Sequence, residues 1–230
     1  MFLSLRPKIL CPLFWGKGWG DLVIVILTFV VVIFGLGFWL PALSARRGCG
    51  GGINCINNLK QVGLAFRMWS NDHGEKFPFA MSIDKAGSLE FIETGEVFRH
   101  FQAVSNELNS PKVLFCPSDT KRNRTADFAR FNNANLSYFV GFDAKETRPQ
   151  TILSGDRTIT TNKNDRLLTG LVMLTNNAPV RWAPGLHTEK RGRGCGNLGL
   201  GDGSAIQGTD KEFQLQLIRG SAPLVRLGVP

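Results

Sequence analysis

Cysteine, histidine and the common short metal-binding motifs are scarce in this chain. Its 230 residues include five cysteines and three histidines, and no Cys-x-x-Cys pair occurs. This count and spacing exclude a disulfide-rich scaffold and a zinc site built from paired cysteines. An Ala-x-Ala pattern is also missing behind the first apolar run, which ends at Leu40 and Pro41. We therefore do not expect a cleaved secretory signal.

The N-terminal part is dominated by an apolar run of 19 residues from Leu22 to Leu40, in which Thr28 is the one polar residue. About 20 residues, each rising 1.5 Å, cross a hydrocarbon core of about 30 Å. The run therefore predicts a retained single-pass transmembrane helix over residues 22–40, behind a short leader or cytoplasmic segment over residues 1–21. Basic residues flank the run equally on both sides, so their charge gives no orientation.

Residues 41–53 predict a hinge, because Pro41 and the four glycines between Gly48 and Gly52 disfavour a continuous helix. From Asn54 to Asn71, apolar residues recur at three- and four-residue spacing. This periodicity predicts an amphipathic helix of about five turns, with Gly74 as its left-handed cap. One extracytoplasmic head domain is expected to fill residues 54–230.

The rest of the head reads as a helix followed by strands. A helix is expected from Glu96 to Leu108, with His100 as a partly covered residue beside its apolar face. Short segments rich in strand formers and bounded by turn residues predict one antiparallel sheet. These segments are residues 112–117, 136–142, 151–159, 170–175, 198–205 and 223–229. The predicted fold class is α+β, with an N-terminal transmembrane helix and an amphipathic helix packed on a small antiparallel sheet.

The chain carries a formal net charge of +9. Its dense basic clusters are confined to residues 121–124 and 190–193, so we interpret most of the excess as an evenly solvated surface. The expected membrane anchor also argues against routine access to nucleic acid. No nucleic-acid partner is therefore expected.

Several motifs follow one another in a fixed order. They are PALSARR at 41–47, CINNLKQVGLAFRMWSNDHGEKFP at 55–78, LFCPSD at 114–119, LSYFVGFDAKETRPQTILSGDRTIT at 136–160, and GNLGLGDGS within the stretch from His187 to Gly203. Together they resemble prepilin-like, type II secretion pseudopilin-like proteins of the Planctomycetes-Verrucomicrobia type. In that family, a His followed by Asp-Gly defines a C-terminal processing-associated domain.

The resemblance implies a set of site residues. Its motif positions fall on Cys55, Asn57, Asn58, Leu59, Lys60, Gln61, Cys116, Pro117, Asp119, Gly155, Asp156, Arg157, His187, Asp202 and Gly203. Prepilin cleavage would follow Gly16, which makes Lys17 the first mature residue and Asp21 the fifth. The family has an aromatic residue and a Glu at these two positions, and about nine residues, rather than 14, between the His and the Asp.

The function that the resemblance implies is assembly rather than catalysis. The chain would be a bacterial inner-membrane protein with an extracytoplasmic head, part of a type II secretion or type IV pilus-like assembly. Its partners would be the inner membrane, other pilin-like subunits, the secretion machinery and a secreted cargo. The alternative is a single-pass anchored binding domain without a filament role, which would recognise a ligand through the loops around Asp156, His187 and Asp202. No enzyme activity and no cofactor are expected.

Three other chemical interpretations of the sequence each have a structural alternative. The GCGNLG sequence at 194–199 fits a dinucleotide motif formally, but a strand before it and a helix after it are missing, so a tight loop is expected. His187, Asp156 and Asp202 with Cys195 suggest a nucleophilic or metal site, but no motif positions them.

Asp202 is the weak candidate for a Ca²⁺ ligand. The structural alternative to a catalytic or metal site is an ion pair or turn hydrogen bonds between Asp156 and Arg157. In an oxidising compartment we favour a disulfide between Cys55 and Cys116. The alternative is that both are free, apolar core cysteines.

Overall fold

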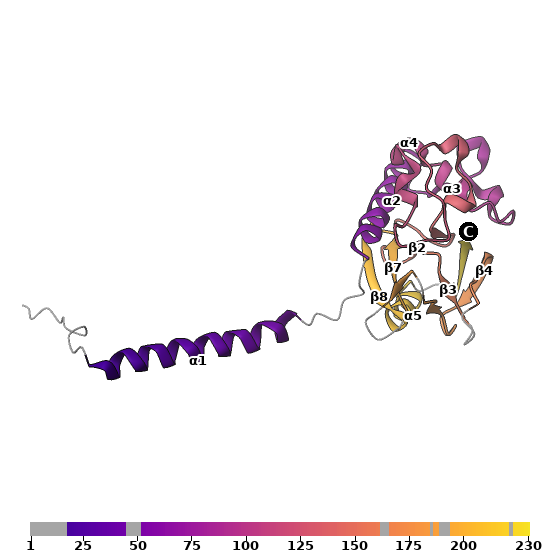
Figure 1. Cartoon of the computed structure of the whole chain (residues 1–230). Helices are drawn as coiled ribbons and strands as arrows, with labels where there is room; N and C mark the ends of the chain where they lie inside the picture. The colour runs from indigo at the N-terminus through magenta and orange to yellow at the C-terminus, as the bar shows by residue number, and fades with distance from the viewer. Residues whose placement is uncertain (1–17, 45–51, 162–165, 185, 189–193, 221–222) are drawn as a thin grey trace, which may run out of the picture. The chain divides into compact units, whose positions relative to one another are not determined.

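The computed structural model describes residues 18–44, 52–161, 166–184, 186–188, 194–220 and 223–230 (Figure 1). Contacts divide the chain into two compact units, residues 1–47 and residues 48–230. Of the expected cleavage site, Gly16 and Lys17 lie outside the described residues, as does most of the expected hinge, and only the backbone of Asp21 is described.

The first unit contains helix α1, Trp19–Ser44. Its side chains are described for residues 19–20 and 22–35, and every apolar one between Leu22 and Phe34 is exposed, from 43% for Val30 to 75% for Phe34. A helix formed by a run of apolar residues, with Thr28 as the one polar residue, is apolar on all sides. Within the described part of the chain, no helix is both long enough and apolar enough to cross a membrane.

The second unit is built on helix α2, Ile53–Asp72, which confirms the predicted amphipathic helix to within one residue at each end. Its buried face consists of Cys55, Leu59, Val62, Gly63, Ala65, Phe66, Trp69 and Ser70. Gly74, just after the helix, has φ +67°. This left-handed conformation is one that glycine adopts at little cost, and it ends the helix where the sequence predicted.

Helix α2 packs on an antiparallel sheet. The strands are β1 (Tyr138–Gly141), β2 (Ile152–Asp156), β4 (Gly170–Thr175), β6 (His187–Thr188), β7 (Gly194–Leu200), β8 (Ala205–Thr209) and β9 (Leu224–Val229). Their order is β4-β9-β1-β2-β7, and both β6 and β8 pair with β7. A separate two-stranded sheet joins β3 (Ile159–Thr160) to β5 (Arg181–Trp182). The predicted class, a long helix on an antiparallel sheet within an α+β head, is confirmed.

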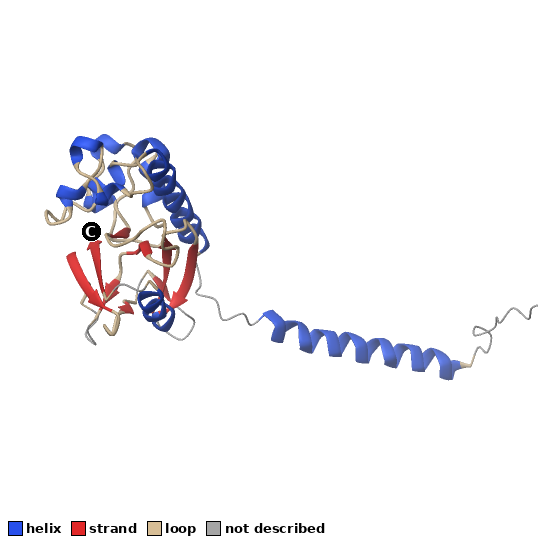
Figure 2. Ribbon diagram, turned by 180° about the vertical axis from the view of Figure 1, so that it is seen from behind, coloured by secondary structure: helices blue, strands red, loops and turns tan. Residues whose placement is uncertain are grey.

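The sheet separates two apolar cores because successive strand residues face opposite sides. On β1, Tyr138 and Val140 belong to the core under α2, whereas Phe139 belongs to the core that contains Phe213 of α5. Figures 1 and 2 show α2, α3 and α4 at one end of the head and α5 at the other, with strands between them. The sequence did not predict α5, Asp210–Arg219, although Thr209 and Glu212 form a capping box at its start.

Three local predictions are wrong. The helix expected from Glu96 to Leu108 is two short helices, α3 (Phe98–Gln102) and α4 (Ser105–Leu108). The strand expected at 112–117 is a 3-10 helix, η4 (Pro111–Leu114), because Pro111 at its first position and the side chain of Ser110 start a helical turn. The loop expected at 194–199 is strand β7.

Glycine in β7 is a packing requirement. A Cβ on Gly196 would lie 2.4 Å from the Trp182 ring, so only glycine lets the indole lie flat against the strand.

The remaining 3-10 helices are η1 (Pro78–Ala80), η2 (Ile83–Lys85), η3 (Leu89–Phe91), η5 (Phe128–Arg130) and η6 (Asn133–Asn135).

Candidate functional site

The residues that the sequence singled out meet first at a disulfide. Cys55, in the first turn of α2, is bonded to Cys116, which follows η4, and their Cα atoms are 5.5 Å apart. Both side chains are wholly buried. The bond joins residues that are 61 positions apart in the sequence, and it therefore fixes the start of α2 to the segment after η4.

A buried histidine and a buried aspartate lie beside this disulfide. His187 Nε2, on the short edge strand β6, is 3.5 Å from Cys116 Sγ and 3.5 Å from Asp156 Oδ2 at the end of β2. Asp156 is wholly buried and His187 is 1% exposed. The tertiary structure therefore brings together four of the site residues that the sequence analysis predicted, which lie up to 132 residues apart in the sequence, from Cys55 to His187.

Asn197 of β7 holds the aspartate in place. Its backbone N–H and its side-chain amide both donate to Asp156 Oδ2, at 2.7 and 2.9 Å. Three other polar atoms of the same cluster, Asp156 Oδ1, His187 Nδ1 and Asn197 Oδ1, are buried and have no hydrogen-bond partner among the described residues. Buried polar atoms without partners are rare in folded proteins, so three in one place call for an explanation.

The electrostatics of this cluster disfavour an ion pair between its two titratable groups. Burial raises the pKa of Asp156 to about 7, although the hydrogen bonds from Asn197 lower it. Burial also lowers the pKa of His187. Both shifts favour the neutral forms, because a charge in this dry interior loses its hydration. Near neutral pH a proton therefore stays on the aspartate rather than moving to the imidazole.

A second buried carboxylate, that of Asp119, is paired with an arginine. Arg157 donates from Nε and Nη2 to both oxygens of Asp119, at 2.7 and 2.8 Å, and both side chains are buried. Burial raises the pKa of Asp119, but the hydrogen bonds and charge of Arg157 outweigh it and leave that pKa below its usual value. The suggested pairing of Asp156 with Arg157 is wrong, since the guanidinium binds Asp119 instead.

The polar residues of the α2 motif divide between the interior and the surface. Leu59 is wholly buried, whereas Asn57, Lys60 and Gln61 are exposed. Asn58 is half-buried and donates to the Phe115 carbonyl at 3.1 Å and to the Tyr138 hydroxyl at 3.3 Å. Its amide therefore joins α2 to the segment after η4 and to the first residue of β1.

A surface hollow of about 350 Å³ lies along the start of α2. Its lining residues are Asn54, Asn57, Asn58, Gln61, Lys112, Phe115, Pro117 and Arg124. Four carboxamides, two cations and one aromatic ring face this space, and none of the lining side chains is acidic. Such a surface can both donate and accept hydrogen bonds, and it favours negative charge on whatever it contacts.

Asp202 and Gly203 form the turn between β7 and β8 rather than joining His187. The Asp202 carboxylate accepts hydrogen bonds from the backbone N–H and the hydroxyl of Ser204. Gly203 has φ +81°, and a Cβ on Gly63 of α2 would lie 2.8 Å from its Cα. The two glycines therefore let the turn sit directly against the helix.

Among the described residues, the one group of three or more histidine, cysteine or carboxylate donors close enough to share a metal ion is Cys55, Cys116 and His187. Asp202, the weak metal candidate from the sequence, is not part of it. Cys195 lies opposite His187 in the β6–β7 pairing, but it is disulfide-bonded. It therefore offers no thiol for the nucleophilic site that was considered.

Of two further sequence-predicted positions, Gly155 has a packing role and Pro117 is at the surface. Pro117 is exposed at the rim of the hollow, and a Cβ on Gly155 would lie 2.6 Å from the Phe139 ring.

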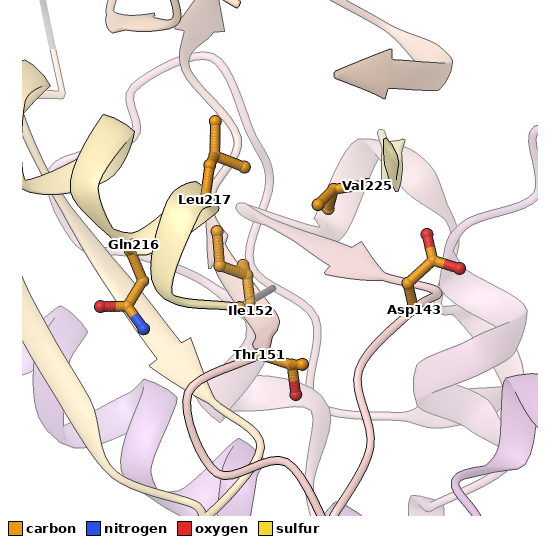
Figure 3. Close-up of a pocket in the computed structure, with 7 residues that line it drawn as sticks. Asp143, Thr151, Ile152, Gln216, Leu217 and Val225 are labelled. Carbon is orange, nitrogen blue, oxygen red and sulfur yellow. The ribbon is translucent and has the colours of Figure 1, made fainter. Parts of the chain in front are cut away.

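Figure 3 shows a second pocket, between α5 and β2, whose volume of about 10 Å³ is near that of one water molecule. It is too small for an organic ligand.

Sequence reasoning missed two buried polar residues, Asn197 of the buried cluster and Tyr138, which contacts Asn58. Asn197 lies in a glycine-rich strand that was expected to be a loop, and Tyr138 lies in an apolar strand. Both side chains are wholly buried, at 0% exposure. A polar residue inside an apolar strand was the available signal, but its partner came from another part of the chain.

Comparisons of the chain with protein-family models, with curated proteins and with solved structures found no match.

Proposed function

We propose that this chain is a membrane-anchored, pseudopilin-like structural subunit of a type II secretion or type IV pilus-like assembly. In this proposal α1 anchors the chain in the bacterial inner membrane, and the second unit is an extracytoplasmic head. Copies of α1 pack against one another and against related subunits, while the heads contact neighbouring heads or a secreted cargo.

The observation that carries the proposal is the exposed apolar surface of α1. From Leu22 to Phe34 its described apolar side chains are all exposed, and the helix belongs to a compact unit of its own. A helix of 26 residues is about 39 Å long at 1.5 Å per residue. An exposed apolar surface of this extent marks a helix that packs against lipid or against other apolar helices.

A second candidate, an anchored binding domain without a filament role, is favoured by the hollow along α2. The loops around Asp156 and His187 do not serve this role directly, because both side chains are buried. The hollow instead offers Asn57, Gln61 and two cations, Lys112 and Arg124, at an open surface. An acidic peptide segment of a secreted protein has the hydrogen-bonding groups and the charge that fit this lining.

The mature N-terminus separates the two functions. Mass spectrometry of the chain isolated from membranes of a host with a prepilin peptidase is expected to find methylated Lys17 after removal of residues 1–16. A matched Gly16→Leu variant should stay unprocessed, because the bulky side chain replaces the glycine before the cut. An intact Met1 in the unaltered chain would count heavily against a processed pilin.

Cross-linking tests the assembly step. A single cysteine at Leu27, on the exposed apolar helix, should form dimers with other copies under mild oxidation if α1 helices pack together. Leu89, an exposed apolar residue of the head at 45% exposure, is the matched control position. Membrane association without cross-linking at position 27 would favour the anchored binding domain instead.

A further inference from the structure

The two cysteines of the disulfide and His187 form a compact set of donor atoms, and the Asp156 carboxylate lies next to that histidine but outside the set. One ligand atom each from Cys55, Cys116 and His187 lie within 4.8 Å of one another. Asp156 Oδ2 is 3.5 Å from the same His187 nitrogen that contacts Cys116. All four side chains are at most 1% exposed. Two sulfurs, one imidazole nitrogen and one carboxylate oxygen are the ligand types of a closed tetrahedral zinc site.

Some polar atoms of this cluster have no hydrogen-bond partner among the described residues in the disulfide form, although Asp156 Oδ2 accepts two hydrogen bonds from Asn197. Asp156 Oδ1 has no hydrogen-bond partner among the described residues, and neither has His187 Nδ1. The nearest arginine in the sequence, Arg157, already binds both oxygens of Asp119. The interior therefore holds a carboxyl group beside a neutral imidazole, and when this carboxyl ionises, no cation among the described residues pairs with it, which makes the charged form costly.

We propose that reduction of the Cys55–Cys116 disulfide converts this cluster into a zinc site, with Cys55, Cys116 and His187 as ligands and Asp156 as the fourth. The zinc ion lies between α2, the segment after η4, and strands β2 and β6, in place of the covalent bond that joins the first two. The hydrogen bonds from Asn197 orient the carboxylate, as outer-shell partners do in other metal sites.

The conversion balances with an external dithiol as the reductant. The dithiol transfers two electrons and two protons to the disulfide, becomes a disulfide itself, and leaves two cysteine thiols in the head. Zinc binding then releases the two thiol protons and the proton of any Asp156 carboxyl that is protonated, because thiolates and a carboxylate are the ligands. With Zn–S bonds of about 2.3 Å, the two sulfurs separate to about 3.8 Å. Oxidation by a disulfide of the same class reverses both steps and releases the ion.

The consequence is that the redox state selects between two links at the same place. The oxidised head has a covalent cross-link and a buried carboxyl group whose Oδ1 has no hydrogen-bond partner among the described residues. The reduced head keeps the same elements together through the metal, and the carboxylate gains a cationic partner. Zinc is favoured over Mg²⁺ and Ca²⁺ because those ions prefer oxygen ligands, and two of the four donors here are sulfur.

The experiment uses the full chain in detergent micelles. One sample keeps its disulfides, and a second is reduced with a phosphine that does not bind zinc and is then handled without oxygen. Each is titrated with Zn²⁺ against a chromogenic chelator, and Co²⁺ serves as an optical probe of the site. We expect one tightly bound zinc per reduced chain, an intense Co²⁺ spectrum typical of tetrahedral thiolate ligation, and at least 100-fold weaker binding by the oxidised chain.

Variants assign the ligands. Cys55→Ser with Cys116→Ser should abolish the thiolate band, and His187→Gln should weaken binding more than about 100-fold, beyond the usual cost of losing an outer-shell partner. Asn197→Ala, which removes such a partner, should cost about 10–100-fold. Cys195→Ala, compared in the reduced state, is the matched control, because Cys195 belongs to another disulfide and is not one of the three donors, and the variant should retain the site.

Far-UV circular dichroism keeps each outcome interpretable. If the reduced chain loses structure without metal, zinc should restore it, as in other metal-coupled folds. Three results would overturn the proposal: no tight zinc binding by the reduced chain, unchanged binding by His187→Gln, or loss of the site in Cys195→Ala but not in the Cys55→Ser, Cys116→Ser variant.

Discussion

Two buried carboxylates near the sheet have opposite surroundings. Asp119 is held at both oxygens by the guanidinium of Arg157, and its pKa lies below the usual value despite burial. Asp156, next to Arg157 in the sequence, faces a neutral imidazole, and burial raises its pKa to about 7. The first is a compensated structural pair. The second carries an electrostatic cost that the disulfide form does not offset, and it marks the place where function is most expected.

Breaking the compensated pair should have the largest effect. Arg157→Leu leaves the Asp119 carboxylate buried without its partner, so we expect a loss of about 3–5 kcal/mol in the free energy of unfolding. Urea denaturation of the full chain in detergent, followed by tryptophan fluorescence, measures it. The double variant Arg157→Leu with Asp119→Leu should recover most of the loss. A single variant that costs less than about 1 kcal/mol would mean that the pair behaves like an exposed one.

Removing the uncompensated charge should act in the opposite direction. At pH 8 the Asp156 carboxyl is ionised, and its folded-state pKa, about 7, lies above the ordinary value of 3.8. Asp156→Asn should therefore stabilise the oxidised chain by up to about 4 kcal/mol, the equivalent of about three pKa units. The same denaturation measurement applies. Asp119→Asn is the matched control and should destabilise, so destabilisation by both variants would erase the contrast.

His100 is a third buried ionisable side chain, outside the cluster, and it should control part of the pH dependence. It is wholly buried, contacts the Ser88 hydroxyl through Nδ1 at 2.8 Å, and burial lowers its pKa to about 4. The unfolded chain therefore binds more protons than the folded chain between pH 4 and 6.5. Stability is fully present above about pH 6.5, and about 3 kcal/mol of it should be lost as the pH falls to about 4.

The His100→Gln variant tests this assignment. It keeps a hydrogen-bonding group near Ser88 but has no titrating ring, so its free energy of unfolding should change less between pH 6.5 and pH 4 than that of the unaltered chain. The difference between the two pH profiles is the measurement. Parallel profiles over this interval would show that another group carries the acid sensitivity.

The smallest effect is expected at a pair with similar geometry but more water. Arg226 donates from Nε and Nη2 to Asp143, as Arg157 does to Asp119, but the Arg226 and Asp143 side chains are 40% and 26% exposed. Arg226→Met should therefore cost less than about 1 kcal/mol in urea denaturation, because water screens the charges and solvates the freed carboxylate. A cost equal to that of Arg157→Leu would show that burial is not what separates the two pairs.

The sequence by itself determined the elements that local patterns encode. The three- and four-residue apolar spacing predicted α2, and runs of strand formers bounded by turn residues predicted β1, β4 and β9. Its failures are also local. Pro111 converts an apolar strand pattern into a helical turn, and glycines that suggested a loop in β7 are there to admit the Trp182 ring.

Only the tertiary structure decided how the polar residues pair. Asp156 is the last residue of β2 and Arg157 follows the strand, and the two side chains meet different partners although they are neighbours in the sequence. Asp156 meets His187 from β6 and Asn197 from β7, and Arg157 meets Asp119 from the segment after η4. These partners come from strand register and from the packing of distant segments. The sequence therefore supplied the candidate residues, and the fold decided which of them share a site.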